Sequence, residues 1–160
     1  MPSTDDNYPL RLLNNGRSKL SSRVFSSDDK LYRSFSKSEV DDDGTIKVNT
    51  IRFPDLSCNW DKFSEPTDVL WRNQSNGCYS FSVSVARYNS YATPVHDPIA
   101  DHDDFPNYAH VEVRALKEGE PFDFEPPKGR SKGRSVFARE ARLRYRTNMK
   151  LLLQIEVEAQ

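Results

Sequence analysis

The chain has 160 residues, a length that suits one domain with a single hydrophobic core and is too short for two. Only 36% of the residues are hydrophobic and 29% are charged, so we expect part of the chain to stay unpacked or to need a partner. The formal net charge of -1 argues against a general nucleic-acid binder.

The start of the chain and its cysteines indicate a compartment. Residues 1–10 have neither the basic start nor the apolar run of a secretory signal. No apolar run in the chain approaches the roughly 20 residues of a membrane helix. Cys58 and Cys78 belong to no CxxC or CxxH pattern, which argues against a zinc finger. We therefore expect a cytoplasmic protein with reduced cysteines, no membrane contact and no cofactor.

Residues 1–29 are rich in serine and charge, and we expect them to form a polar tail. Their leucines could still form a short helix that docks on the domain. The periodicity then predicts strands over residues 30–36, 45–53, 78–88 and 108–116. A helix should begin near Ser64, which can cap free N–H groups, with Pro66 in its first turn.

Residues 134–153 give the clearest helical pattern. Phe137, Ala141, Tyr145, Met149 and Leu152 form one apolar stripe, and the opposite side is expected to carry a set of cations: Arg139, Arg142, Arg146 and Lys150. Residues after 150 alternate enough to end as a strand instead. The fold class is therefore α+β, with one domain over residues 30–160. Its antiparallel sheet has about four to five strands, with one long amphipathic C-terminal helix.

The basic residues gather at the end of the chain. Residues 128–160 hold nine Lys or Arg and three Glu, which gives +6 and leaves -7 for the rest. Such asymmetry is typical of a surface for nucleic acid or for an acidic protein. The alternative is that this basic face pairs with the acidic face of the same fold or of a second copy, as in a homodimer.

The stretch His96–His110, HDPIADHDDFPNYAH, is the richest in chemistry-bearing side chains. Three histidines and four aspartates supply enough donors for a metal ion. However, the spacing H-x5-H-x7-H matches no tight metal motif, and aspartates also occur simply because they stabilise turns. We therefore expect no metal site here.

A second interpretation places His96 and His110 at one end of a sheet, if the segments on either side of this stretch pair. Tyr108, His110 and Arg114 then share one strand face, because side chains repeat every two residues. Two imidazoles with a tyrosine and an arginine suit a metal-independent nuclease or phosphodiesterase. In the alternative interpretation His110 only bonds its neighbours and Arg114 pairs with Glu112 or another acid.

A third group lies at residues 53–71. Asn59 and Lys62 could hold a phosphate or carboxylate, helped by the helix N-terminus after Ser64. The alternative is a capped helix whose large apolar side chains belong to the core.

Two segments resemble a group of small bacterial proteins to which no activity is attached. The first is SCNWDKFSEPTDVLW at 57–71, and the second is HDP at 96–98 with NYAHVEVRA at 107–115. The likeness covers roughly residues 51–116. It departs from the pattern at Val111, where a small polar residue is expected, and in a longer acidic insert at 101–104. The resemblance implies bacterial origin and one compact domain, and it directs attention to the polar side of residues 108–116.

Together these observations predict a small bacterial intracellular protein that binds a protein or nucleic-acid partner, partly through its basic C-terminal helix. The second prediction is a small nuclease or phosphodiesterase that uses His96 and His110, as a toxin or defence component would.

Overall fold

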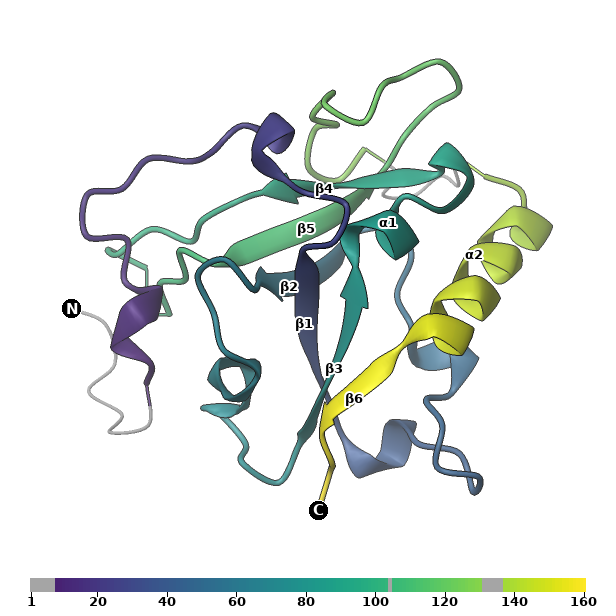
Figure 1. Cartoon of the computed structure of the whole chain (residues 1–160), viewed down its shortest axis with the longest axis horizontal. Helices are drawn as coiled ribbons and strands as arrows, with labels where there is room; N and C mark the ends of the chain where they lie inside the picture. Colours follow the sequence, from purple (N-terminus) through teal and green to yellow (C-terminus); the bar gives the residue numbers. More distant parts are fainter. Residues whose placement is uncertain (1–7, 104, 131–136) are drawn as a thin grey trace.

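The computed structural model describes residues 8–103, 105–130 and 137–160. They form a six-stranded antiparallel sheet with strand order β4-β5-β2-β1-β3-β6 (Figure 1). The strands are β1 (Lys30–Phe35), β2 (Leu56–Trp60), β3 (Gly77–Ser82), β4 (Ala92–His96), β5 (His110–Ala115) and β6 (Gln154–Val157). The α+β class is confirmed, with one or two strands more than the sequence predicted. No helix in the described parts of the chain is both long and apolar enough to cross a membrane.

One face of the sheet, called the core face below, is almost entirely apolar. Trp60 pairs with Leu31 across β1 and β2, and Cys58 pairs with Val111 across β2 and β5, so these side chains share one side. Trp60 is fully buried, and its ring lies 4.0 Å from the ring of Phe25. This cluster forms the main hydrophobic core and supplies most of the stability that burial provides.

Two helices cover the core face. α1 (Val83–Ala86) follows β3 directly, because the Ser82 hydroxyl accepts a bond from the Val85 N–H and ends the strand. α2 (Arg139–Leu152) lies beside α1 (Figure 1). Its Tyr145 stacks on Phe53 with ring centroids 3.9 Å apart and donates a hydrogen bond to the Ala86 carbonyl. The predicted apolar stripe is confirmed at Ala141, Tyr145 and Met149, whereas Leu152 is exposed.

The opposite face, called the polar face below, carries Ser57 and Asn59 on β2 and His110, Glu112 and Arg114 on β5. Loops cover much of it. The Phe122 carbonyl accepts a bond from Thr93, and the Pro126 carbonyl accepts one from Arg114. Glu112 and Arg114 are consequently only 6% and 7% exposed. The polar face is therefore largely an interior surface.

The N-terminal segment packs onto the domain from residue 8 onward, so the predicted tail is wrong for residues 8–29. Tyr8, Leu12 and Phe25 are buried, and the segment runs past the ends of β4 and β5 before it enters β1 (Figure 1). Long-range bonds hold it, such as the one that Ser22 Oγ donates to Glu125. Residues 1–7 lie outside the described residues. The described chain also forms short 3-10 turns: η1 (Leu10–Leu12), η2 (Ser22–Val24), η3 (Lys37–Glu39), η4 (Val48–Thr50), η5 (Pro66–Leu70) and η6 (Tyr88–Ser90).

Several predicted boundaries are corrected by the structure. Residues 45–53 form the turn η4 and irregular backbone instead of a strand, although Ile46, Ile51 and Phe53 are buried as their pattern suggested. The helix expected at Ser64 is the short turn η5, and its start is stabilised by the Asp68 carboxylate, which accepts a bond from the Glu65 N–H. Residues 78–88 divide into β3 and α1.

Candidate functional site

His96 and His110 do lie at the same end of the sheet, because β4 and β5 pair antiparallel. However, the register sets His96 opposite Val111, not opposite His110. Side chains directly opposite each other on paired strands point to the same face, and neighbours along a strand point to opposite faces. His96 therefore lies on the core face and His110 on the polar face, so the two imidazoles do not face one site.

His96 is fully buried, and both of its ring nitrogens are engaged. Nδ1 accepts a hydrogen bond of 2.9 Å from the Leu20 N–H, so Nε2 carries the proton and donates to the Tyr108 carbonyl at 2.6 Å. Burial is the main cause that lowers the pKa of His96 below its usual 6.5. The ring is a neutral structural group that joins the N-terminal segment to the sheet.

Tyr108 was also predicted for the polar face, but it precedes β5 and turns to the core side. Its ring packs edge-on against His96 at 4.9 Å, and its hydroxyl donates to the Ser18 carbonyl at 2.6 Å. The phenol is therefore directed away from His110.

Arg114 does share a face with His110, as predicted, but its guanidinium is occupied. Nε donates to Glu112 at 2.8 Å, and the two Nη groups reach the Pro126 carbonyl at 3.0 Å and Asp97 at 3.3 Å. His110 donates from Nδ1 to the Asp97 carbonyl at 2.7 Å, since a carbonyl oxygen can only accept. This arrangement matches the structural alternative, in which His110 bonds its neighbours and Arg114 pairs with Glu112.

The third histidine, His102, lies on the surface, 3.7 Å from the carboxylate of Asp103. Across residues 8–103, 105–130 and 137–160, no three His, Cys, Asp or Glu side chains gather closely enough to hold a metal ion. The three histidines of the 96–110 stretch thus lie at three separate places in the fold.

Asn59 and Lys62, predicted to bind one anion together, are also separated. The buried amide of Asn59 accepts a bond from Asn107 at 2.7 Å and donates one to Ser64 at 3.1 Å. Lys62 is exposed, with its ammonium 5.9 Å from the ring of Phe63. Both hydrogen-bonding sides of the Asn59 amide are used inside the protein, so these two residues form no joint phosphate site.

The cations of α2 do not lie opposite its apolar stripe, which corrects the predicted arrangement. Arg142, Arg146 and Lys150 each follow a buried residue by one position, so they flank the stripe and are half-buried. Lys150 pairs with Asp41 at 3.1 Å. Arg139 is exposed at the first turn of the helix. The side of the helix that faces solvent carries Leu143 and Leu151 together with the exposed Arg139 and Arg144.

Arg142 and Arg146 are electrostatically unusual. The Nε atom of each is buried without a hydrogen-bond partner among the described residues. Burial, followed by the charge of Arg142, lowers the pKa of Arg146. Two like charges therefore lie one helical turn apart, and no carboxylate of the described chain pairs with either of them. A negative group brought to this flank would relieve the repulsion between the two guanidinium groups.

Arg146 opens onto a cleft of about 620 Å³ between α2 and the segment before β2. We call it the helix cleft. Its charged lining consists of Arg52, Asp55, Glu112, Lys128 and Arg146, with Ser57 on its floor. Glu112 is already paired with Arg114, so its charge is compensated.

Arg52 and Lys128 are the residues of this cleft that sequence reasoning missed. Both are exposed, and Lys128 makes only a long contact of 3.9 Å to Asp97. Lys128 belongs to the basic run after residue 127, which was a usable signal. No sequence pattern pointed to Arg52, because the packing of Phe53 against Tyr145 is what brings its side chain near the other cations of the cleft.

Comparisons of the chain with protein-family models, with curated proteins and with solved structures gave no match. The likeness of residues 51–116 to small bacterial proteins therefore stays a prediction.

Proposed function

We propose that the protein is a binding module for nucleic acid, and that the helix cleft holds the phosphate backbone. The observation that carries the proposal is the pair Arg142 and Arg146, half-buried like charges on one flank of α2 that no carboxylate of the described chain neutralises, with Arg146 lining the cleft. Arginine is well suited to phosphate because its planar guanidinium can donate two parallel hydrogen bonds.

The exposed cations Arg52 and Lys128 extend this site across the cleft. A row of cations along an open cleft suits successive phosphates better than a single small anion. The charge bias fits as well, because residues 128–160 carry +6 in a chain whose total is -1. The cations of the cleft would contact phosphates, which carry no sequence information, so binding should be tolerant of base sequence.

The metal-independent nuclease is favoured less. Catalysis by the predicted pair requires two imidazoles at one substrate, and His96 is buried on the other side of the sheet with both nitrogens engaged. Arg114, which was to stabilise the transition state, is already bonded to two carboxylates.

The test is a retardation assay with a 20-nucleotide RNA and DNA, single-stranded and duplex, at 50 and 200 mM salt. Four phosphate contacts predict that affinity falls by about 50- to 150-fold between these concentrations. The double variant Arg52→Glu with Lys128→Glu should lose most binding at 50 mM salt. Both side chains are exposed, so the variant should fold normally.

The matched control is Lys37→Glu with Lys117→Glu, which changes the net charge equally at two exposed positions outside the cleft. The proposal is overturned if wild type retains no nucleic acid at 50 mM salt, or if both double variants bind equally. Retention of polyglutamate without retention of any nucleic acid would show instead that the cleft takes an acidic protein.

A further inference from the structure

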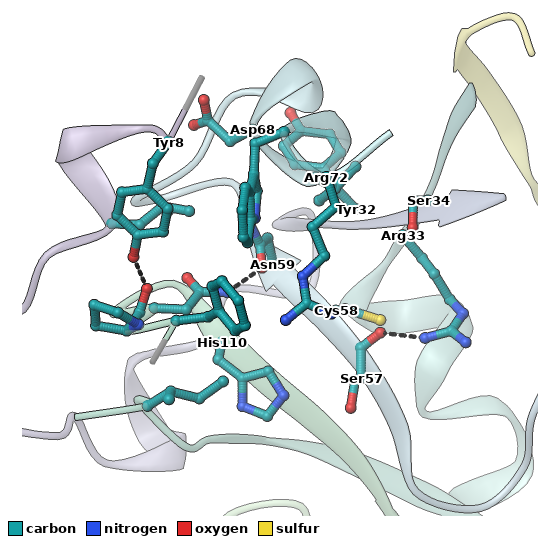
Figure 2. Close-up of a pocket in the computed structure, with 17 residues that line it drawn as sticks. Tyr8, Tyr32, Arg33, Ser34, Ser57, Cys58, Asn59, Asp68, Arg72 and His110 are labelled. Atoms are coloured by element: carbon teal, nitrogen blue, oxygen red, sulfur yellow. Dashed lines mark hydrogen bonds between the residues drawn. The ribbon is translucent and has the colours of Figure 1, made fainter. Parts of the chain in front are cut away.

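A second hollow of about 290 Å³ lies on the polar face of the sheet (Figure 2), and Ser57 lines both this hollow and the helix cleft. We call it the sheet pocket. It opens over β1, β2 and β5, and the residues that define it below are Tyr8, Arg33, Ser57, Trp71, Arg72 and Phe105. Its size is at the lower end of the range for small-molecule sites, and it is too small for a folded peptide or a nucleic-acid strand.

One wall of the sheet pocket is aromatic and rigid. The rings of Tyr8 and Trp71 meet edge to face at 5.3 Å, and Trp71 and Phe105 are tilted against each other at 5.0 Å. The Tyr8 hydroxyl donates to the Pro106 carbonyl, which ties this wall to the loop before β5. Such a wall provides flat apolar surface at little cost in side-chain entropy.

Arg72 lies across this wall and points into the pocket (Figure 2). Its guanidinium is 4.2 Å from the centre of the Phe105 ring and 5.2 Å from that of Trp71. In the described chain it contacts these rings and forms no hydrogen bond or ion pair. Stacking thus fixes the direction of the cation while its five donors stay available.

The other wall adds a hydroxyl, because the Ser57 side chain is exposed. The Arg33 guanidinium is already engaged, since it bonds the Ser57 carbonyl at 2.8 Å and the Tyr79 side chain. The acid of the lining, Asp68, already accepts a bond from the Glu65 N–H and lies 3.4 Å from Arg11. The pocket therefore offers the Arg72 cation and one hydroxyl to a ligand, and no uncompensated carboxylate among its described lining residues.

The chemistry of the pocket favours binding over a covalent reaction. Cys58 is one of the lining residues, but its side chain belongs to the core face, where burial raises the pKa of the thiol to about 12. The sulfur is therefore a neutral thiol at physiological pH and a weak nucleophile.

We propose that the sheet pocket binds a small aromatic oxyanion, a single flat ring that carries a carboxylate or a phosphate. The ring would lie against Trp71 and Phe105, and the oxyanion would be held by Arg72 and the Ser57 hydroxyl. This inference does not depend on nucleic-acid binding in the helix cleft, since the two sites share only Ser57.

The experiment is a titration of the full chain, followed by NMR or calorimetry, with four probes. Phenyl phosphate and benzoate carry both features, inorganic phosphate lacks the ring, and phenol lacks the charge at neutral pH. We expect phenyl phosphate or benzoate to bind about tenfold or more tightly than both inorganic phosphate and phenol. The stronger of the two identifies the preferred oxyanion.

Arg72→Gln should weaken that binding by about 10- to 100-fold, whereas Arg52→Gln, an equal charge change in the helix cleft, should leave it unchanged. Circular dichroism checks that both variants are folded, as expected for exposed side chains. The proposal is overturned if neither aromatic anion binds, if phenol binds as tightly as they do, or if the two variants weaken binding equally. None of these results affects the retardation assay, so the two proposals fail separately.

Discussion

The two faces of β2 and β5 are built from alternate residues of the same strands and differ in what holds them together. On the core face, Trp60 and Val111 are held chiefly by packing and burial, and the one polar atom of the Trp60 ring donates a bond to Asp29 at 3.0 Å. On the polar face, Glu112 and Arg114 are almost as deeply buried, yet they are held by hydrogen bonds and charge. Alternation of polar and apolar residues therefore does not by itself mean that one face meets water. In this fold loops cover the polar face and leave hollows where they do not reach.

The largest effect should come from the core face. Trp60→Ala removes a fully buried ring that packs on Phe25 and Phe63, and it should lower the free energy of unfolding by about 4 kcal/mol. Urea denaturation measures this loss. Ser57→Ala, on the polar face of the same strand, is the control and should change stability by about 0.5 kcal/mol or less, because its side chain is exposed. Equal losses would mean that the two faces are not as different as their packing indicates.

A somewhat smaller effect is expected from the buried ion pair. Arg114→Met leaves Glu112 buried without its partner and should lower the free energy of unfolding by about 3 kcal/mol. Changing Glu112→Leu in addition removes the stranded charge, so the double variant should recover about half of the loss in the same urea experiment. If the double variant is no more stable than Arg114→Met, the bond to the Pro126 carbonyl is the main contribution of this arginine.

The smallest effect concerns His96, which brings polar bonds into the core face. His96→Phe keeps a ring but leaves the Leu20 N–H and the Tyr108 carbonyl without their hydrogen-bond partner. The variant should lower the free energy of unfolding by about 2 kcal/mol at pH 7.5. The wild type should also lose stability as pH falls below 6.5. The pKa of His96 is lower in the folded state than in the unfolded chain, so the unfolded state binds more protons there.

This second effect is measured by comparing unfolding of wild type and His96→Phe between pH 7.5 and 5. The variant lacks the group and should show a weaker dependence on pH over this interval. Identical dependence in the two proteins would mean that His96 does not titrate differently in the folded and unfolded states.

Regular elements with a clear period were predictable from the sequence, and the way they combine was not. The alternation in 108–116 correctly placed Val111 and Val113 on one face of the strand and Glu112 and Arg114 on the other. The stripe through Tyr145 correctly gave the buried side of α2. Both signals are local, because each depends only on the repeat of one element.

β2 and β4 were missed because their signals are weak. LSCNW is short and mixes polar with apolar residues, and β4 contains Pro94, which an edge strand tolerates because one of its sides forms no ladder bonds. The predicted histidine site failed for a related reason. The faces of His96 and His110 depend on register, and a shift of one residue moves a side chain to the other face. The lining of the sheet pocket comes from segments between residues 8 and 110, which no local pattern connects.

The bonds that secure the N-terminal segment also determine the order in which this domain can be completed during synthesis. Tyr8 bonds Pro106, Leu20 bonds His96 and Lys19 bonds Glu125, and these partners lie 98, 76 and 106 residues later in the chain. Each bond can form only after the later residue has been synthesised. At about 5–20 residues per second, a ribosome needs roughly 4 to 20 s to deliver those partners. During that interval Leu12 has no Ala109 to pack against, and the core that Phe25 enters is still incomplete. The serines and charges around them, which suggested a tail, keep the nascent segment hydrated until its partners have been made.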